Sequence, residues 1–393
     1  MKRCTRCLLP ETHETIRFNK EGICSVCQNF EQKSNTDWGA KKNELDAILE
    51  KHRGKGNYDC IIPFSGGKDS VFTLYYAVKV LGLKPLVVSF DHGFYRPNLI
   101  ETRNKVLKEL GVDFLSFSPN WKLVQKLMLK SFLDKGDFCW HCHTGIFSYP
   151  MWIAIEKKIP LVLWGEPSSE YTSYYDYSEV EKVDEDRFNR IINLGISARD
   201  MAARLNYEFD DRDFSPFTYP DAQLLQDLQV VSVPLGSFIP WDVKAQVQII
   251  KSELGWQGDE VEGVPPEYDY EKVECYMQGV RDYIKYLKRG YARTTHLTSL
   301  DIRNGRKTRE ESIELVEKYE KKIPYNLELF LKYTGLTEEE FIKVVDKHKI
   351  LEDSQPIFQI GKKPKDFETL LTHPLMLRAH TKDLLEQWER ENS

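Results

Sequence analysis

The sequence lacks the features that mark membrane-spanning, secreted and strongly nucleic-acid-binding proteins. No stretch approaches the roughly 20 apolar residues that a membrane-spanning helix needs. No apolar run follows the charged residues at positions 1–4, so we expect no secretory signal. A net positive charge is also missing, because the formal charge is -6, and this disfavours a nucleic-acid partner. We therefore expect a cytoplasmic protein that binds neither a membrane nor nucleic acid.

Cysteine is sparse, with eight residues in 393, and its spacing is more informative than its number. In a reducing compartment, closely spaced cysteines indicate metal or redox sites rather than disulfides. Cys4 and Cys7 form one Cys-x-x-Cys pair, and Cys24 and Cys27 form a second pair sixteen residues later. Two such pairs supply four thiolates for a tetrahedral Zn²⁺ ion. The sequence thus predicts a closed structural zinc site.

A third pair, Cys139 and Cys142, lies within a Cys-Trp-His-Cys-His segment and has several interpretations. The pair could bind a second metal, with Cys275 or Cys60 as a distant ligand, or it could carry redox chemistry. It could equally have a structural role in an active-site loop. The sequence leaves these alternatives open.

Short apolar runs alternate with helical periodicity beyond residue 57, which predicts an α/β fold. Such alternation produces a mostly parallel sheet covered by helices, with ligands at the carboxyl ends of the strands. The remainder of the chain is expected to be mainly helical. The predicted strands are 58–64, 85–90, 114–117 and 160–164, and the predicted helices are 69–81, 98–110, 121–132, 147–157, 269–288 and 307–321.

A glycine-rich segment joins the first predicted strand to the first predicted helix. Its two glycines allow a sharp turn, and the N–H groups at the helix start attract an anion. Lys68 adds a cation, and Asp69 can cap the helix or hold Mg²⁺. The segment is not a Walker A loop, because an acid follows Lys68 and the first glycine of that motif is missing. It reads Ser65-Gly66-Gly67-Lys68-Asp69-Ser70.

This hexapeptide resembles the SGGxDS motif of the PP-loop ATP pyrophosphatases, which transfer AMP from ATP and release pyrophosphate. The resemblance implies a parallel-sheet domain of the adenine nucleotide alpha hydrolase-like class, with Lys68 and Asp69 as catalytic residues. Two later loops would then also contact ATP. They are Asp91-His92, after the second strand, and Gly165-Glu166, after the fourth.

Motifs along nearly the whole chain together resemble the N-acetyl sugar amidotransferases of bacterial surface-polysaccharide (including LPS O-antigen) and nonulosonic-acid synthesis. The resemblance implies an enzyme that uses ATP to convert the acetamido group of a nucleotide-linked sugar into an acetamidino group. The motifs are the two N-terminal cysteine pairs, residues 64–70, 138–142 and 239–242, and the segment 289–306.

The last of these segments is rich in basic residues set among glycines in predicted loops. Such clusters favour contacts to a diphosphate or a nucleotide sugar, although a solvated helix face would look similar. The residues expected to bind the substrate are Arg289, Arg293, His296, Arg303 and Arg306.

These interpretations divide the chain into four parts. We expect a zinc-binding Cys4 unit at 1–30, a helical linker at 31–57, a PP-loop domain at 58–255 and a mainly helical substrate-binding region at 256–393. No glutaminase motif is recognisable, so ammonia is expected from a partner. The resemblance implies a glutaminase subunit and a cyclase-like subunit that channels ammonia, and it leaves room for an oligomer.

Two other functions stay open. One is a PP-loop tRNA thiolase that uses Cys139 and Cys142 in sulfur transfer, although the negative net charge disfavours it. The other is a non-catalytic zinc-containing scaffold that has kept a nucleotide site, which the intact residues Lys68 and Asp69 disfavour.

Overall fold

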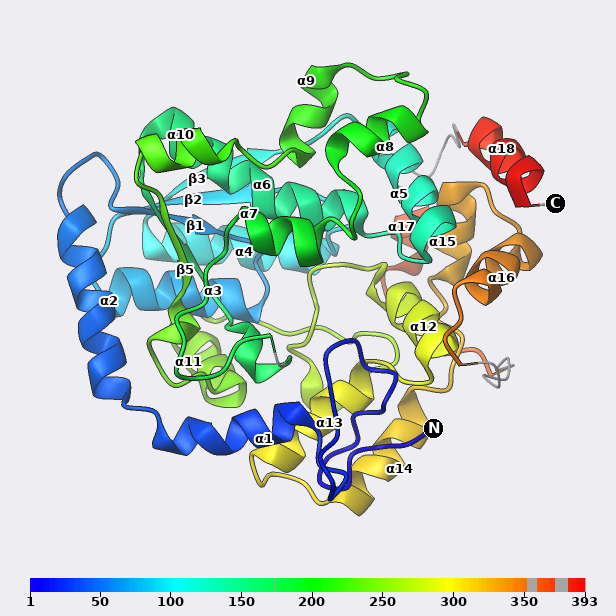
Figure 1. Cartoon of the computed structure of the whole chain (residues 1–393), viewed down its shortest axis with the longest axis horizontal. Coiled ribbons are helices and arrows are strands. Elements are labelled where there is room, and N and C mark those ends of the chain that lie inside the picture. Colours follow the sequence, from blue (N-terminus) through cyan, green and yellow to red (C-terminus); the bar gives the residue numbers. More distant parts are fainter. Residues whose placement is uncertain (173, 352–358, 372–380, 393) are drawn as a thin grey trace.

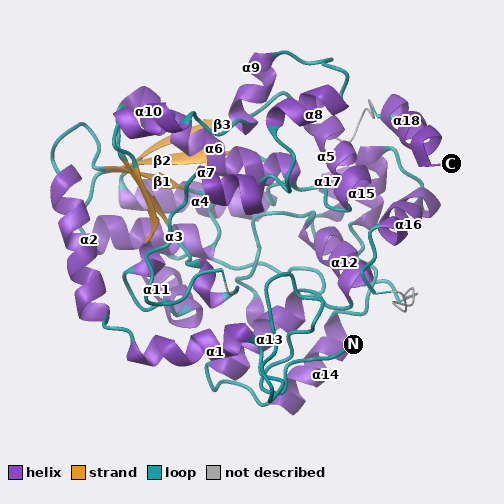
Figure 2. Cartoon of the chain, viewed as in Figure 1, coloured by secondary structure: helices purple, strands orange, loops and turns teal. Residues whose placement is uncertain are grey.

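The computed structural model describes residues 1–172, 174–351, 359–371 and 381–392. A five-stranded, fully parallel sheet lies between layers of helices (Figure 1, Figure 2). The strands are β1 (Cys60–Pro63), β2 (Pro85–Phe90), β3 (Asp113–Phe117), β4 (Leu161–Trp164) and β5 (Val231–Pro234). This arrangement confirms the predicted α/β fold class with a parallel sheet.

The strand order, β3-β2-β1-β4-β5, places a switch point between β1 and β4. The chain proceeds outward from β1 to β3 and then crosses back to add β4 on the other side of β1. Loops that leave neighbouring strands in opposite directions open a crevice, and ligands of parallel sheets bind there. The glycine-rich turn follows β1 and Glu166 follows β4, so both lie at this crevice.

Helices cover both faces of the sheet. On one face lie α3 (Lys68–Tyr75), which continues as a π-helical turn to Val80, and α11 (Val243–Leu254). On the other face, α6 (Trp140–Lys157) packs across β1, β2 and β4. The connections are α4 (Pro97–Leu110) and α5 (Trp121–Lys135), and, between β4 and β5, the short helices α7 (Glu185–Arg187), α8 (Ala198–Arg204), α9 (Asp211–Phe214) and α10 (Ala222–Asp227).

The C-terminal helices share a core with α5 instead of folding apart from it. Phe132 of α5 packs against Phe330 and Phe341, with ring centroids 5.4 and 5.3 Å away. The helices are α12 (Gln278–Arg289), α13 (Arg293–Arg303), α14 (Arg309–Tyr319), α15 (Leu327–Thr334), α16 (Glu338–Lys347), α17 (Phe367–Leu371) and α18 (Lys382–Asn392). No helix in the described ranges is long and apolar enough to cross a membrane.

The N-terminal cysteine unit extends into α1 (Ser25–Gln32), which contains Cys27, and α2 (Trp38–His52) follows. The unit lies against α13 and α14 (Figure 1). The backbone N–H of Leu8 donates to Ser299 Oγ at 3.1 Å, and Arg309 donates to the carbonyl of Cys4 at 3.4 Å. The unit is therefore bound to helices about 300 residues further along the chain.

Several elements differ from the prediction; one is the basic segment expected as loops, in which Arg293–Arg303 form α13. Strand β5 was not predicted, and α6 begins at Trp140 instead of Phe147, so Cys142 lies in its first turn. The predicted helix 269–288 begins only at Gln278. Residues 269–277 are held out of the helix by tertiary contacts, including a bridge between Tyr95 and Cys275, which sequence periodicity does not register.

Candidate active site

The turn between β1 and α3 is held in one conformation from several sides. Gly66 has a φ of 86°, which favours glycine, and an added Cβ would lie 3.3 Å from Arg103. Trp256 donates its indole N–H to the carbonyl of Gly66 at 3.0 Å. Ser70 Oγ accepts from the N–H groups of Ser65 and Gly66 at 3.3 and 3.1 Å. The turn is thus preorganised to receive an anion at the start of α3.

A chain of buried ion pairs begins at Lys68. Its ammonium lies 2.7 Å from Asp69 Oδ2 and 2.9 Å from Glu271 Oε2. Arg293 then contacts Glu271 at 3.3 Å and Asp282 at 3.4 Å. Burial alone would lower the pKa of Lys68, but Asp69 and Glu271 hold that pKa well above its usual value. Lys68 therefore stays charged beside the turn.

Asp69 and Glu166 form a pair of carboxylates that fits a divalent cation. Burial, and then the neighbouring charge of Glu166, raises the pKa of Asp69 to about 7. Burial acts against ionisation of Glu166 too, but Lys272 and Lys68 keep its pKa below the usual value. Within the described residues, the buried Oδ1 of Asp69 has no hydrogen-bond partner. Two close carboxylates with a spare oxygen suit Mg²⁺, which prefers oxygen ligands.

Lys272 is a site residue that the sequence interpretation missed. Its φ of 50° lies in the left-handed region, which is uncommon for residues other than glycine and occurs preferentially at functional sites. The charges that act on it most strongly are those of Glu166 and Glu274. The sequence interpretation placed Lys272 in a predicted helix over 269–288. No pattern in the sequence indicates that Lys272 lies close to Glu166 instead.

Two adjoining cavities open at this edge of the sheet. The first, which we call the phosphate-loop cavity, has a volume of about 370 Å³ and is lined by Ser65, Asp69, Ser70, His92, Gly165 and Glu166 among others. The second, the basic cavity, measures about 290 Å³ and is lined by Tyr171, Lys285, Arg293 and His296 among others. Glu166, Arg187, Lys272 and Arg281 line both cavities, so the two spaces meet at these side chains.

Most of the residues predicted to contact ATP lie at the first cavity, with a few differences. Gly66 and Gly67 form the turn itself, and Lys68 is buried next to it. Asp91 does not line the cavity; its carboxylate accepts from Gly93 N and Ser118 Oγ, both at 2.9 Å. It stabilises the loop that carries His92.

The predicted substrate-binding set divides into two groups. Arg293 and His296 line the basic cavity, whereas Arg289, Arg303 and Arg306 line neither cavity, which corrects the prediction. These three arginines have structural partners instead. Arg289 contacts Glu14 at 3.0 Å, Arg303 donates to the carbonyl of Glu170 at 3.1 Å, and Arg306 contacts Asp242 at 2.6 Å. Arg281 and Lys285, which lie within the predicted helix 269–288, line the basic cavity instead.

Three cysteines also line the phosphate-loop cavity. They are Cys139, Cys142 and Cys275, which come from the start of α6 and from the segment before α12. Burial raises the pKa of each thiol, to about 12 for Cys275. The sequence suggested Cys275 as a distant partner of the other two, and the structure places all three at one cavity.

The four N-terminal cysteines fit a tetrahedral metal. They are fully buried, and their sulfur atoms all lie within 4.8 Å of one another. Cys7 and Cys24 Sγ are 3.8 Å apart, and Cys4 and Cys27 Sγ are 4.0 Å apart. Zinc–sulfur bonds of about 2.3 Å in a tetrahedron separate the sulfurs by about 3.8 Å. The arrangement is therefore that of a four-thiolate site.

An aromatic stack connects this cysteine unit to the basic cavity. His13 of the unit stacks on His296, with ring centroids 6.5 Å apart, and His296 stacks on Tyr171 at 5.2 Å. Glu14 accepts a hydrogen bond from Tyr291 at 3.0 Å. The unit thus helps to position a wall of the cavity.

Residues 267–369 match the family model for the C-terminal domain of WbpG-like LPS biosynthesis proteins. The match supports the family resemblance over that segment. The segment contributes Glu271, Lys272, Arg281 and Arg293 to the two cavities and to the ion-pair chain. A recognisable family domain therefore forms one side of the candidate active site.

Other relatives match a shorter part of the chain. The "Uncharacterized protein MJ1599" of Methanocaldococcus jannaschii is 31% identical over 115 residues, which are 29% of this chain and 41% of that protein. A glutamine-hydrolysing GMP synthase of Pyrobaculum aerophilum is 28% identical over 122 residues, which are 30% of this chain and 23% of the synthase. The chain thus spans less than half the length of these curated relatives.

Among solved structures, the U34-tRNA thiolase NcsA from Methanococcus maripaludis, with its [4Fe-4S] cluster, matches 81% of this chain and 89% of the thiolase. The sequence identity is 17% and the TM-score is 0.28.

Proposed function

We propose that the protein is an AMP-forming amidotransferase that acts on a nucleotide-linked N-acetyl sugar in the synthesis of LPS or a related surface polysaccharide. The observation that carries this proposal is the junction of the phosphate-loop cavity with the basic cavity at Glu166 and Lys272. ATP in the first cavity and an anionic sugar nucleotide in the second would meet there. The match of residues 267–369 to a WbpG-like domain supports this substrate class.

The phosphate-loop cavity provides for binding and activation of ATP. The N–H groups at the start of α3 and the ammonium of Lys68 would stabilise the charge that develops on pyrophosphate as it leaves. Asp69 and Glu166 would hold Mg²⁺, which neutralises phosphate charge and helps to orient the phosphates.

The first chemical step activates a poor electrophile. The acetamido oxygen attacks the α-phosphorus of ATP, the bond between the α-phosphorus and the bridging oxygen breaks, and pyrophosphate leaves. The amide nitrogen loses its proton, so the product is an O-adenylated imidate with a carbon–nitrogen double bond. Because water would hydrolyse this intermediate, the site has to be closed around it.

The second step replaces oxygen with nitrogen. Ammonia attacks the imidate carbon, the carbon–oxygen bond breaks and AMP leaves. The protons of ammonia are shared between the two nitrogens, which gives an acetamidino group. A glutaminase and a cyclase-like partner subunit would deliver the ammonia.

The basic cavity has the chemistry to bind the sugar nucleotide. Arg281, Lys285 and Arg293 bring three cations to a space beside the phosphate loop, and guanidinium groups bind diphosphates through paired hydrogen bonds. The stacked rings of Tyr171 and His296 present a flat wall, on which a base or a sugar ring can pack.

The decisive experiment incubates the protein with ATP, Mg²⁺, ammonium chloride and UDP-N-acetyl sugars. We expect AMP and pyrophosphate by ³¹P NMR, and a sugar product about 1 Da lighter, because NH replaces O. Formation of ADP and orthophosphate would refute the proposal. The same mixture without ammonium distinguishes amidation from hydrolysis of the adenylate.

A second candidate, sulfur transfer to tRNA, is favoured by one observation. Cys139, Cys142 and Cys275 line the same cavity as the phosphate loop, and three thiolates suit a soft metal such as an iron–sulfur cluster. Anaerobic purification with iron and sulfide analysis tests this function, together with AMP release that depends on tRNA and a sulfur donor. Iron-free protein that forms an amidine excludes it.

A further inference from the structure

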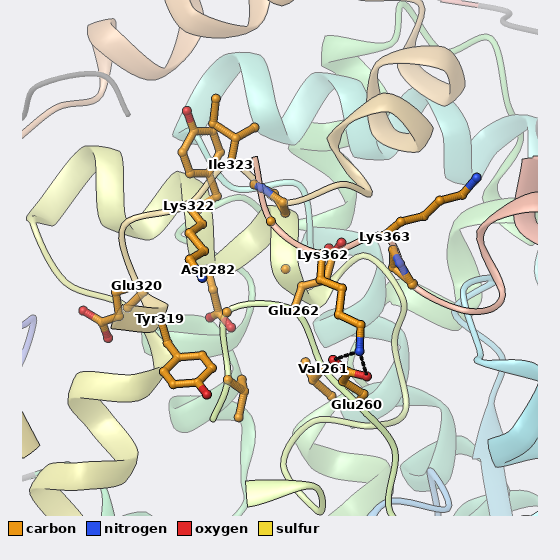
Figure 3. A pocket seen from close by; sticks show the side chains of 18 of the residues that line it. Glu260, Val261, Glu262, Asp282, Tyr319, Glu320, Lys322, Ile323, Lys362 and Lys363 are labelled. Atoms are coloured by element: carbon orange, nitrogen blue, oxygen red, sulfur yellow. Dashed lines mark hydrogen bonds and ion pairs between the residues drawn. The ribbon is translucent and has the colours of Figure 1, made fainter. Parts of the chain in front are cut away.

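A third cavity lies behind the basic cavity and is not used by the mechanism above (Figure 3). Its volume is about 280 Å³, and it is lined by residues from the segments 259–266, 318–324 and 361–366, together with part of α12, Arg96 and Ala292. Lys362 forms an ion pair with Glu260 near its opening (Figure 3). Asp282 and Ala292 line this cavity and the basic cavity alike. The two cavities therefore adjoin at these two residues.

We propose that this third cavity is the inlet through which ammonia reaches the adenylated acceptor, with Asp282 and Ala292 at its inner end. The proposal rests on the proposed amidotransferase function and assigns a route to its nitrogen substrate. We call the cavity the ammonia inlet.

The first argument is one of access. During the second step AMP occupies the phosphate-loop cavity, and the sugar nucleotide occupies the basic cavity. Ammonia that entered by the same openings would have to pass both ligands, and any gap wide enough for it would also admit water. The inlet reaches the basic cavity from the side of Asp282 and Ala292, which are 7% and 5% exposed. A small nucleophile can arrive there while the other openings stay filled.

The second argument is the chemistry of the lining. The carboxylates of Glu262 and Asp282 line the inlet, beside cations that include Arg96 and Lys322. Glu320 lines it too, but its carboxylate accepts a hydrogen bond from Thr295 Oγ1 at 2.9 Å. Carboxylates accept hydrogen bonds from ammonium and ammonia alike. Burial raises the pKa of Glu262 to about 7, so this group exchanges protons near neutrality. A carboxylate of this kind can take a proton from ammonium and release the neutral nucleophile into the site.

The third argument is the size of the residues along the path. Ala292 lies where the inlet adjoins the basic cavity, and Gly279 lines the inlet next to Glu262. An added Cβ at Gly279 would lie 2.6 Å from Glu262 Oε2 and 3.3 Å from Pro324. Two of the smallest residues thus line the route proposed for ammonia, and one added carbon atom at Gly279 would obstruct it.

Two narrowing variants, Ala292→Leu and Gly279→Ala, test the inlet. The readouts are the KM for ammonium chloride in amidine formation and acceptor-dependent ATP–pyrophosphate exchange, which measures adenylation without ammonia. We expect the KM for ammonium to rise by about tenfold or more in both variants, equivalent to about 1.4 kcal/mol. The exchange rate should be unchanged in Gly279→Ala, because Gly279 does not line the basic cavity. More AMP should be released per amidine, because stalled adenylate is hydrolysed.

Ala203→Leu is the matched control, because it makes the same enlargement at an exposed position of α8. If Ala292→Leu disturbs folding and abolishes the exchange, the test of the inlet rests on Gly279→Ala. We expect this variant to keep α12 folded, because alanine has a higher helix propensity than glycine. If a variant retains the exchange activity and its KM for ammonium is unchanged, the inlet is refuted while the proposed function stands. A wild-type protein without ammonia-dependent turnover would overturn the proposed function, and the inlet with it.

Discussion

Lys68 and Asp69 are neighbours in the sequence, but they depend on different surroundings. Lys68 contacts two carboxylates, and one of them, Glu271, is about 200 residues away. Removing one partner of a buried charge costs on the order of 3–5 kcal/mol. The cation beside the phosphate turn is therefore maintained by the C-terminal segment as much as by its own motif.

Replacing Lys68 with methionine should lower the rate of acceptor-dependent AMP formation by on the order of 10²–10³-fold, because a preorganised charge at the leaving group is lost. Lys79→Met is the control, since Lys79 is an exposed residue beyond the same helix. Steady-state assays of AMP release measure both variants. A Lys68→Met protein with the wild-type rate would exclude a role for this cation.

Asp69 should make the ligand-free protein less stable as the pH rises. Its pKa is raised to about 7 in the folded state, so between about pH 4 and pH 7 the folded protein holds a proton that the unfolded chain has released. The free energy of unfolding should fall over that interval, and Asp69→Asn should reduce the fall. Urea unfolding at pH 5 and pH 8 measures this, with Asp211→Asn at an exposed position of α9 as the control. Equal pH dependence in wild type and Asp69→Asn would contradict the prediction.

At the scale of the element, local geometry and distant contacts act together. The phosphate turn requires a left-handed glycine at position 66, and it also requires Trp256 and Ser70 to fix its carbonyl and N–H groups. The cysteine unit likewise has its own metal ligands, but it is docked on α13 and α14.

Gly66→Ala and Gly82→Ala separate backbone strain from function in the turn. Both glycines have a positive φ, 86° and 66°, but Gly82 has no atom within 4 Å of an added Cβ. We expect each variant to lose about 1 kcal/mol of stability, measured by denaturant unfolding. Only Gly66→Ala should also raise the KM for ATP. An equal effect of both variants on ATP use would show that the turn does not contact the nucleotide.

The cysteine unit should hold a single zinc ion per chain and should influence acceptor binding. His13→Ala removes the ring that stacks on His296, so the KM for the sugar nucleotide should rise while the KM for ATP stays constant. His52→Ala, at the end of α2, is the control. Elemental analysis gives the metal content. Iron in place of zinc would contradict the expected zinc site, and an unchanged acceptor KM in His13→Ala would contradict a role of the cysteine unit in acceptor binding.

On the scale of the whole molecule, helix α5 and the C-terminal helices share one buried cluster. Leu127 and Phe132 of α5 belong to the same buried cluster as Tyr276, Phe330 and Phe341. The two cavities lie between these parts, and the chain of ion pairs from Lys68 to Asp282 crosses from one to the other. The division predicted between residues 255 and 256 therefore separates segments that share buried surface.

A protein that ends at residue 266 should fail to fold cooperatively, because the apolar side of α5 would lose its cover and large exposed apolar patches promote association. We expect aggregation or strong binding of a hydrophobic dye, compared with the full chain under the same conditions. A soluble fragment with a sharp unfolding transition would show that residues 58–255 are an independent domain.

The sequence by itself determined the features that depend on near neighbours. A strand, a glycine-rich turn and a helix follow one another within about fifteen residues, and two cysteine pairs define a thiolate site by spacing alone. The alternation of strands and helices was sufficient for the parallel sheet, because each βαβ unit is local.

Only the tertiary structure decided which distant side chains complete the site. Glu271 and Lys272 reach the phosphate turn because their segment is held out of the helix that periodicity predicts. Arg303 and Arg306, in contrast, hold other parts of the chain and do not line either cavity. The physical reason is the same in each case: contacts between residues 64 to about 200 positions apart depend on how the helices pack, and local spacing carries no record of that packing.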